Sequence, residues 1–351
     1  MNQVKDKIDI RKLDLPMLEK YITEQLGEPR FRSKQIWKWL WQKRASTFVE
    51  MTDLSAVLRE KLPEIFSINP IVLDKIQRSQ DGTIKSRFRL YDGHLIESVL
   101  IPVPSDNRYT VCVSCQVGCS LSCKFCATGQ MKRVRNLDPG EIFDQVFLVN
   151  QQCLESFDRP LTNIVYMGMG EPLLAYQPVI QSIERITAPD GLNMSPRRIT
   201  VSTAGIAKMI RKMADDQVKF NLALSLHAAD DEKRNEIMPI NEQNNLEVLQ
   251  QALVYFYQNT HNKITLEYIA FQNFNDGIAD ADNLARFCKA FPVVVNIIEY
   301  NPISGFDKVK SSADRIDTFA RRLSSLGVSV TVRRSRGKDI DAACGQLANK
   351  G

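Results

Sequence analysis

The sequence predicts an α/β protein in which parallel strands alternate with helices, preceded by a helical N-terminal region and a small antiparallel sheet. Three observations predict this fold. Residues 10–66 have a helical pattern, residues 70–103 have an alternating pattern typical of strands, and from residue 109 onward the two kinds of segment alternate. The 351 residues, 44% of them hydrophobic and 25% charged, are enough for one large domain and a small one.

Residues 10–66 contain three expected helices. The segment LDLPMLEKYITEQLG ends at Gly27, a residue type that stops helices, and SKQIWKWLWQKR and LSAVLREKL follow it. The next segments, IVLDKIQRS, IKSRFRLY and HLIESVLIPV, are predicted to be strands because the breaks at Asp81-Gly82 and Asp92-Gly93 are strong hairpin signals. We therefore assign residues 1–68 to a helical accessory domain and residues 69–108 to an antiparallel extension.

From residue 109 onward, strands and helices are expected to form parallel βα units, packed as a barrel or as an open sheet. Helical segments at 246–256 and 312–326 each carry apolar side chains on one face, and Gly327 ends the second. In a barrel, the chemistry lies at the C-terminal ends of the strands. The expected strands are YTVCVSC, LTNIVYMGMG, RRITVSTAG, VKFNLALSLH, KITLEYIAF, VVVNIIEYN and VSVTVRRS, and polar or glycine-containing clusters end several of them: GMGEP, STAG, SLH and Asn301-Pro302.

The composition excludes some classes of protein. No apolar run is long enough to span a membrane, and MNQVKDKIDIRKLDL lacks the apolar core of an export signal. We therefore expect no membrane association and a cytoplasmic location. Cytoplasmic thiols stay reduced, so a structural disulfide framework does not explain the eight cysteines.

Five of the eight cysteines lie in CVSCQVGCSLSCKFC, residues 112–126, and three of these five have the spacing C-x3-C-x2-C. Structural zinc prefers four ligands, and no second pair or sequence-adjacent His completes such a set. A [4Fe–4S] cluster normally takes four thiolates, so three leave one iron open for a non-protein ligand. An open iron is what cleavage of S-adenosylmethionine requires. Zinc and incidental buried cysteines remain the alternatives.

The cysteine spacing, with Phe125 before the third Cys, resembles the radical SAM signature, and GMGEP resembles the glycine-rich turn of that superfamily. CVSCQVGCSLSCKFCATG, RRSRGKDIDAACGQL and FRSKQIWKWLWQK together resemble the RlmN/Cfr family of RNA methyltransferases, over nearly the whole chain. The resemblance implies a radical SAM core, a partial (βα)6 barrel, in residues 109–340. It also implies that residues 341–351 carry a methyl-accepting cysteine and that the N-terminal domain binds RNA.

The resemblance also implies the site residues. Cys344 receives a methyl group from one S-adenosylmethionine, and a radical made from a second activates that methyl so that its carbon adds to an adenine ring carbon. Cys112 then releases the RNA by forming a transient disulfide with Cys344, and Glu97 accepts the ring proton. The implied ligands of one [4Fe–4S] cluster are Cys119, Cys123 and Cys126, and the implied S-adenosylmethionine contacts are Gly170, Glu171, Ser202, Ser225, Leu226, His227 and Asn301.

Each of these residues has a simpler interpretation. Cys344 is small and lies beside two alanines, as buried structural cysteines often do. Glu97 is equally consistent with a solvent-facing strand residue, and the polar residues at strand ends with helix caps or turns. Cys115 stands where the family usually has Ser and receives no role, and Cys153 and Cys288 are expected to be packing residues in helices.

Basic segments suggest where RNA binds. Residues 30–44 carry six Lys or Arg, no acid, and all three tryptophans, Trp37, Trp39 and Trp41. Basic and aromatic side chains together suit phosphate contact and base stacking; the alternative is an amphipathic helix with its tryptophans inward. Two further basic runs, QMKRVRN and RRSRGK, flank the proposed chemistry, and binding through them should weaken steeply with added salt.

The resemblance favours methylation of adenine C2, at adenine 2503 of 23S rRNA and at adenine 37 of tRNA, with a flavodoxin- or ferredoxin-type electron donor. A Cfr-type enzyme would methylate C8 instead, but Val117 occupies a position where that branch tends to have another Cys. Two alternatives of other classes are a non-catalytic zinc RNA-binding module and an iron–sulfur electron carrier.

Overall fold

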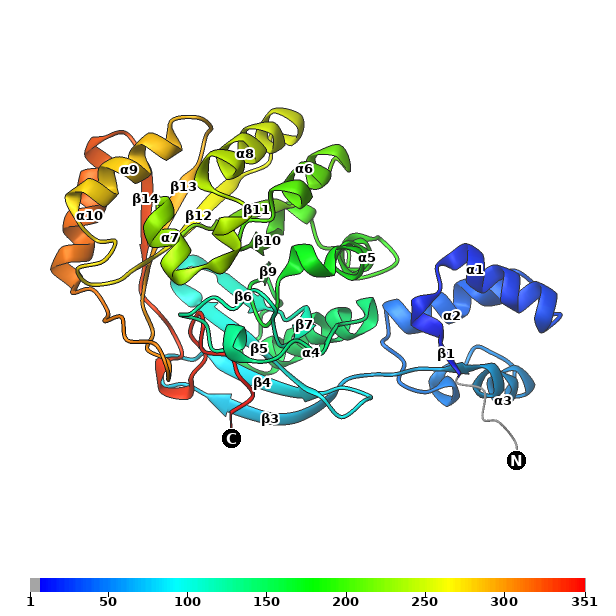
Figure 1. Cartoon of the computed structure of the whole chain (residues 1–351). Coiled ribbons are helices and arrows are strands. Elements are labelled where there is room, and N and C mark those ends of the chain that lie inside the picture. Colours follow the sequence, from blue (N-terminus) through cyan, green and yellow to red (C-terminus); the bar gives the residue numbers. More distant parts are fainter. Residues whose placement is uncertain (1–6, 351) are drawn as a thin grey trace.

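The structure is a computed structural model that describes residues 7–350. Residues 1–6 and Gly351, at the ends of the expected N-terminal domain and C-terminal segment, lie outside the described residues. A helical lobe at the N-terminus lies to one side of a large curved sheet (Figure 1). Further helices pack along the outside of this sheet (Figure 1). The C-terminal tail returns to the edge of the sheet near its antiparallel strands (Figure 1).

The N-terminal lobe consists of the three expected helices and a two-stranded parallel pair. Asp14 and Ser55 accept backbone hydrogen bonds as N-caps of the first and third helices, and Gly27, at φ 67°, follows the first. The elements are β1 (Ile8–Asp9), α1 (Leu15–Lys20) with a π-helical continuation (Tyr21–Gln25), α2 (Phe31–Trp41), α3 (Ala56–Ile65) and β2 (Phe66–Ser67).

A ten-stranded mixed sheet forms the rest of the framework, in the order β14-β13-β12-β11-β10-β9-β6-β5-β4-β3. The three expected hairpin strands are antiparallel: β3 (Val72–Arg78), β4 (Ile84–Arg89) and β5 (Leu95–Val103). The seven expected strands of the core pair in parallel: β6 (Arg108–Cys112), β9 (Asn163–Tyr166), β10 (Ile199–Thr203), β11 (Asn221–Ser225), β12 (Ile264–Ala270), β13 (Val294–Glu299) and β14 (Ser329–Arg333). The expected α/β architecture of parallel strands alternating with helices is confirmed, with the antiparallel strands joined to the parallel strands through the β5–β6 pair.

Helices follow the first six parallel strands and cover the outer face of the curved sheet (Figure 1). Cys153 and Cys288 are buried in two of them, as expected for packing residues. The helices are α4 (Pro139–Phe157), α5 (Tyr176–Thr187), α6 (Ala207–Asp215), α7 (Asp231–Ile237), α8 (Leu246–Thr260), α9 (Ile278–Cys288) and α10 (Ala313–Ser325). Short 3₁₀ turns lie at Ile10–Lys12, Phe48–Glu50, Pro104–Asp106, Thr128–Gln130, Pro172–Ala175, Pro196–Arg198, Pro239–Glu242 and Lys338–Ile340. No helix within residues 7–350 is both long and apolar enough to cross a bilayer.

One buried carboxylate joins the lobe to the core. Asp144 of α4 accepts hydrogen bonds from Arg11 at 3.0 Å, from Arg44 at 3.0 Å and from the backbone N–H of Ile71 at 3.1 Å. These three donors come from the chain before α1, the chain after α2 and the chain before β3. Because a buried carboxylate needs such partners, the contact fixes three separate segments against α4.

The tryptophans of α2 mostly face inward. Trp37 and Trp41 are 4% and 2% exposed, and Trp41 packs edge-on against Phe143 of α4 with ring centroids 5.2 Å apart. Trp39 is only partly buried, and Lys43 lies over its ring. The interpretation of α2 as an amphipathic helix with inward tryptophans is therefore confirmed for Trp37 and Trp41. The prediction that RNA bases stack on these two rings is wrong, because the rings are buried.

We predict that Trp41→Ala lowers the free energy of unfolding by about 3–5 kcal/mol, because it leaves a cavity between the lobe and α4. Trp39→Ala is the matched control in the same helix and should cost clearly less, since its ring is partly exposed. Denaturant unfolding of both variants measures the difference. Equal losses would contradict the packing role of Trp41.

Candidate active site

The cysteine loop lies between β6 and α4 and is shaped by a glycine. A short antiparallel pair, β7 (Gln116–Val117) and β8 (Arg135–Asn136), closes it at its base. Gly118 has φ +72°, and a Cβ there would lie 2.3 Å from the carbonyl oxygen of Lys132. A side chain at this position is excluded both by backbone conformation and by space, so the two arms of the loop can approach closely only at a glycine.

The loop lies over the C-terminal ends of the parallel strands. The ring of Phe125 packs edge-on against His227, with centroids 4.7 Å apart, and against Phe271 at 6.0 Å. Phe125 belongs to a small buried cluster with residues from the ends of β10, β12 and β13, among them Ala204, Ile269 and Ile298. This apolar contact holds the three spaced cysteines at the end of the barrel where chemistry is expected.

Cys119, Cys123 and Cys126 are partly accessible, whereas Cys112, Cys115, Cys153 and Cys288 are buried. Burial raises the pKa of the Cys119 thiol to about 11, and burial together with the two neighbouring thiols raises that of Cys123. Thiols that hinder one another's ionisation become thiolates when a bound cation compensates them. The three side chains are thus close enough to interact and are suited to a positively charged group.

The donor set fits a cluster better than a single ion. Within residues 7–350, no three or more His, Cys, Asp or Glu side chains converge tightly enough to hold one metal ion. In a [4Fe–4S] cluster each thiolate binds a different iron, and three thiols spread around a loop suffice for three of the four irons.

The glycine-rich turn after β9 lies against the start of the cysteine loop. The carbonyl of Met169 accepts hydrogen bonds from the backbone N–H groups of Cys115, at 2.9 Å, and Gln116, at 3.2 Å. Gly170 has φ +100°, and a Cβ there would lie 2.5 Å from the Cβ of Gln116. The turn is therefore locked beside the cysteine loop, and Gly170 is required by its conformation and by the close approach.

Glu171 fixes this turn to the neighbouring strand. One carboxylate oxygen accepts from the N–H of Leu173 at 3.0 Å, and the other from the N–H of Ala204, after β10, at 2.8 Å. Burial raises the pKa of Glu171 to about 7, although both hydrogen bonds oppose the rise. Both oxygens are thus used within the protein, and the side chain positions the backbone of the turn.

The other expected cofactor contacts gather at the same end of the sheet. The hydroxyl groups of Ser202 and Ser225, on adjacent strands, lie 3.4 Å apart. Leu226 is fully buried directly after β11, and Asn301, after β13, donates to the hydroxyl of Ser335 at 3.0 Å. The structure thus brings Ser202, Ser225, Leu226 and Asn301 to the C-terminal ends of three strands, as the sequence predicts, while their contacts with a cofactor stay a prediction.

His227 is held as a neutral imidazole. Its Nδ1 accepts a hydrogen bond from the backbone N–H of Ile269 at 3.1 Å, and its backbone carbonyl accepts from Asn275. Burial lowers the pKa of the imidazole to about 3, and the nearby Arg234 lowers it further. His227 therefore links the end of β12 to the cysteine loop, through Phe125, without carrying charge.

The C-terminal tail brings Cys344 to the cysteine loop. The N–H of Ala127 donates to the carbonyl of Gly345 at 2.7 Å, and the hydroxyl of Thr128 donates to the carbonyl of Leu347 at 2.6 Å. Cys344 is exposed, yet burial of its surroundings raises the thiol pKa, as do Glu267 and Cys126. Because the side chain of Cys344 is exposed, its interpretation as a buried structural residue is wrong.

Cys112 lies at the end of β6, within electrostatic range of Cys344. Burial raises the pKa of the Cys112 thiol, and Cys344 is the next largest contribution. All eight cysteines are free thiols in the structure. The structure thus places the tail beside Cys126, since a Cβ at Gly345 would lie 3.9 Å from the Cα of Cys126, and it places Cys112 and Cys344 within electrostatic range of each other. Cys115 instead donates to the carbonyl of Met169 and is buried.

Glu97 of β5 is only 1% exposed, so its interpretation as a solvent-facing strand residue is wrong. One carboxylate oxygen lies 3.5 Å from the Nζ of Lys85. The other accepts from the backbone N–H groups of Ala348, at 3.0 Å, and Asn349, at 3.1 Å. The C-terminal tail therefore covers the carboxylate that the family resemblance assigns to proton transfer.

Sequence reasoning missed three charged side chains near this site: Lys85, Arg234 and Glu267. Glu267 is 4% exposed on β12, and its carboxylate accepts from Asn296 at 2.7 Å. An acid within the apolar strand KITLEYIAF is a signal that could have been noticed. Arg234 lies in the charged run DDEKRNE, which has the composition of a solvated helix face and gives no such signal.

The basic segments are partly neutralised. Arg135 pairs with Asp92 at 2.6 Å and with Glu141 at 2.7 Å, whereas Lys132 and Arg133 are exposed. Of the three basic side chains in QMKRVRN, two therefore remain available to an external anion. Their contact with RNA stays a prediction.

The second basic segment is clamped by Glu299, at the end of β13. This carboxylate lies 2.6 Å from Lys338, 3.0 Å from Arg334 and 3.3 Å from Lys310. Burial opposes its ionisation, but hydrogen bonds from Lys338 and Arg334 outweigh burial and lower its pKa to about 2. The clamp fixes the chain just before the tail that carries Cys344.

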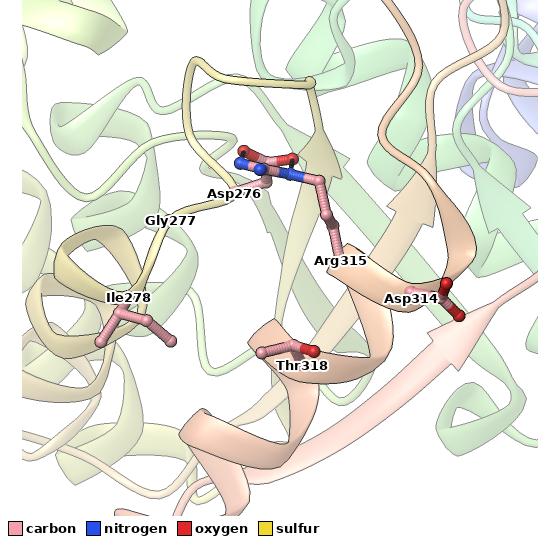
Figure 2. A pocket seen from close by; sticks show the side chains of 6 residues that line it. All are labelled: Asp276, Gly277, Ile278, Asp314, Arg315 and Thr318. Carbon is pink, nitrogen blue, oxygen red and sulfur yellow. Dashed lines mark hydrogen bonds and ion pairs between the residues drawn. The ribbon is translucent and has the colours of Figure 1, made fainter.

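A surface pocket of about 260 Å³ lies apart from these residues, and none of the predicted site residues lines it. In this pocket the Arg315 guanidinium faces Asp276 and donates to both of its carboxylate oxygens, at 2.7 and 2.6 Å (Figure 2). Asp276 follows Asn275, whose amide donates to the carbonyls of His227 and Ile269. The pair thus secures the loop that supports His227.

Comparison with known proteins identifies matches over almost the whole chain. Residues 8–68 match the family described as "Ribosomal RNA large subunit methyltransferase N-terminal domain", and residues 113–298 match "Radical SAM superfamily". A probable dual-specificity RNA methyltransferase RlmN of Cytophaga hutchinsonii is 53% identical, covering 97% of this chain and 93% of that protein. One of the same description from Christiangramia forsetii is 52% identical, covering 99% and 98%.

A solved structure agrees with these matches. The crystal structure of a radical SAM methyltransferase from Sphaerobacter thermophilus superposes with a TM-score of 0.91 at 38% identity. The match covers 98% of this chain and all of that chain. The likeness therefore includes both the helical lobe and the barrel.

The clamp at Glu299 generates a prediction about stability. Because the folded-state pKa of about 2 lies below the ordinary value of 4.5, the ionised group stabilises the fold above pH 4.5 and loses this contribution as the pH falls toward 2. Glu299→Gln should lower the free energy of unfolding by roughly 1–3 kcal/mol at pH 7, and by less at pH 3. Denaturant unfolding at both pH values measures this difference, with Glu155→Gln, an exposed carboxylate on α4, as control. If Glu299→Gln loses the same free energy of unfolding at pH 3 as at pH 7, the ionised Glu299 does not stabilise the fold in this way.

Proposed function

We propose that this chain, which belongs to the RlmN family of radical SAM RNA methyltransferases, methylates C2 of an adenine in 23S rRNA and of an adenine in tRNA. The proposal is supported by relatives named dual-specificity RNA methyltransferases that are 53% and 52% identical over nearly the full chain. The observation that carries it is the packing of the C-terminal tail on the cysteine loop, through the Ala127–Gly345 and Thr128–Leu347 hydrogen bonds.

As a radical SAM protein, the chain uses a [4Fe–4S] cluster and S-adenosylmethionine. In the proposed site Cys119, Cys123 and Cys126 would hold the cluster. When bound, these groups supply a methyl group and the one-electron chemistry that activates it. The turn at Gly170 and Glu171 and the strand-end residues Ser202, Ser225, Leu226, His227 and Asn301 would then orient S-adenosylmethionine between the cluster and Cys344.

Cys344 is the proposed methyl carrier. A thiolate is a strong nucleophile toward a methyl sulfonium, whereas C2 of adenine is an electrophilic carbon that cannot attack one. Carrying the methyl group as a thioether on the tail therefore separates the polar step from the radical step. The exposure of Cys344 suits this role, because it leaves the sulfur accessible to a methyl donor and to RNA.

Cys112 and Glu97 complete the proposed reaction. After the carrier carbon has bonded to the ring and the adduct has given up its unpaired electron to the one-electron centre, Glu97 accepts the ring proton. The Cys112 thiolate then attacks the sulfur of Cys344, the bond from that sulfur to the methylene carbon breaks with its electron pair going to carbon, and the carbon takes up a proton to become the methyl group. A Cys112–Cys344 disulfide remains and the RNA is free. Glu97 is available only when the N–H groups of Ala348 and Asn349 have moved away from its carboxylate. RNA entry and displacement of the tail are therefore parts of one event.

Reduction of the cluster and of the disulfide requires an external electron donor, for which a flavodoxin or a ferredoxin is suited. The exposed Lys132 and Arg133, which follow the cysteine loop, are the proposed phosphate contacts nearest the site. The proposed location is the cytoplasm, where these donors and the RNA substrates occur.

The position of the methyl group tests the proposed function. RNA from cells with and without the protein is digested to nucleosides and analysed by mass spectrometry against both methyladenosine standards. We expect 2-methyladenosine only when the wild-type protein is present, and none with Cys344→Ala. Finding 8-methyladenosine instead would establish the Cfr-type alternative and contradict the choice of C2.

The role of Cys112 has a separate test. Cys112→Ala should stop turnover at one methyl transfer or fewer per protein and leave a covalent protein–RNA adduct, because no thiol remains to release Cys344. Denaturing gel electrophoresis detects the adduct. Cys115→Ala is the matched control, since Cys115 is also buried on the same segment, and it should form no adduct. Free methylated RNA at the normal rate from Cys112→Ala excludes the resolving role.

A further inference from the structure

Arg234 of α7 is a buried cation without an ion-pair partner. It is 0% exposed, and no carboxylate within residues 7–350 forms an ion pair with it. A guanidinium cannot lose its charge under ordinary conditions, and burying it without a counter-charge costs several kcal/mol. Such a group in a stable fold requires an explanation.

The hydrogen bonds of Arg234 place it among the expected cofactor contacts. Its Nη2 donates to the carbonyls of Ala204, at 2.5 Å, and Ser225, at 3.4 Å, and its Nε donates to the carbonyl of Leu226 at 3.1 Å. These carbonyls belong to the ends of β10 and β11. Arg234 therefore fixes two adjacent strand ends beneath the cysteine loop.

Within residues 7–350, the hydrogen bonds of Arg234 reach an acid only through an intervening side chain, that of Asn241. Nη1 of Arg234 donates to the side-chain oxygen of Asn241 at 2.6 Å, and the amide of Asn241 donates to Asp231 at 2.8 Å. Asp231 thus reduces the effect of the cation but does not neutralise it directly. Three carbonyl dipoles and one amide leave a net positive charge inside the protein.

That charge is close to the cysteine loop. The backbone N–H of Lys124, next to Cys123, donates to the carbonyl of Ile237, the last residue of α7, at 3.0 Å. Cys123 also packs against the buried cluster that contains Ile237 and Ala204, and Arg234 donates to the carbonyl of Ala204. A cluster held by three thiolates is an anion, and its reduction adds another negative charge. The charge and hydrogen-bonding environment of an iron–sulfur cluster set its reduction potential.

We propose that Arg234 is the internal counter-charge of the cluster and raises its reduction potential, while also holding the ends of β10 and β11 in place. The inference rests on the proposed cluster site at Cys119, Cys123 and Cys126. It assigns Arg234 as a positioning and electrostatic residue, acting through the cluster rather than on RNA.

The reduction potential of the reconstituted protein tests this role. Anaerobic redox titration followed by electron paramagnetic resonance gives the midpoint potential without any measurement of methylation. Arg234→Gln removes the charge but keeps donor groups, so the midpoint should fall by at least the 59 mV that corresponds to a tenfold change in a one-electron equilibrium. Arg234→Lys keeps the charge and should shift the midpoint by clearly less. Equal midpoints for wild type and Arg234→Gln overturn the proposal.

A second variant covers the case in which Arg234→Gln does not fold. Asp231→Asn removes a negative charge near Arg234 and keeps the side-chain oxygen that accepts from the N–H of Leu246. The midpoint should then rise, opposite in sign to the effect of Arg234→Gln, and an unchanged or lower midpoint overturns the proposal.

Iron and sulfide analysis of Cys123→Ala tests the cluster site separately. Loss of iron is expected. If Cys123→Ala kept all of its iron, the cluster assignment would be refuted. The midpoint potentials of the Arg234 variants, measured with all three cysteines present, test the role of Arg234 separately.

Discussion

The site depends on one constraint, the return of the C-terminal tail across the end of the barrel to meet the cysteine loop. Two hydrogen bonds, Ala127 to Gly345 and Thr128 to Leu347, make this contact. The sheet adds further contacts, because Glu97 and the carbonyl of Leu95, both on β5, accept hydrogen bonds from the end of the tail. Each such bond contributes only about 1 kcal/mol net, so the contact is specific in geometry but weak enough to open.

The charged groups around this contact share a way of being stabilised. Glu171 is held by backbone N–H groups, Glu97 by two backbone N–H groups and Lys85, and Arg234 by three carbonyls. Backbone dipoles orient a buried charge without cancelling it. The end of the barrel therefore contains both positive and negative buried charges. Because the dielectric constant is low there, these charges act strongly on any group bound between them.

Much of the fold follows from local sequence signals, because hydrophobic period and turn chemistry are local properties. The Asp-Gly pairs predicted the β3–β5 hairpins, and alternation predicted the seven parallel strands. The joining of β5 to β6, which makes the antiparallel strands part of the barrel sheet, depends on pairing between distant segments and has no local signal. In the site, cysteine spacing identified the loop, but the burial of Glu97 and Arg234 depends on elements that only the folded chain brings over them.

The proposed chemistry depends on how the C-terminal tail that carries Cys344 is anchored. Cys344 has to reach a methyl donor, a nucleobase and the sulfur of Cys112 in turn, and these cannot occupy one point. The clamp at Glu299 fixes the chain at Lys338, and Asp341 and Gly345 adopt left-handed conformations in the segment that follows. The end of the tail is held as well, because Ala348 and Asn349 donate to Glu97 and the side-chain amide of Asn349 donates to the carbonyl of Leu95 at 2.7 Å. In the proposed reaction these contacts have to open before Glu97 can accept a proton, so the carrier segment and the base are coupled through one stretch of chain.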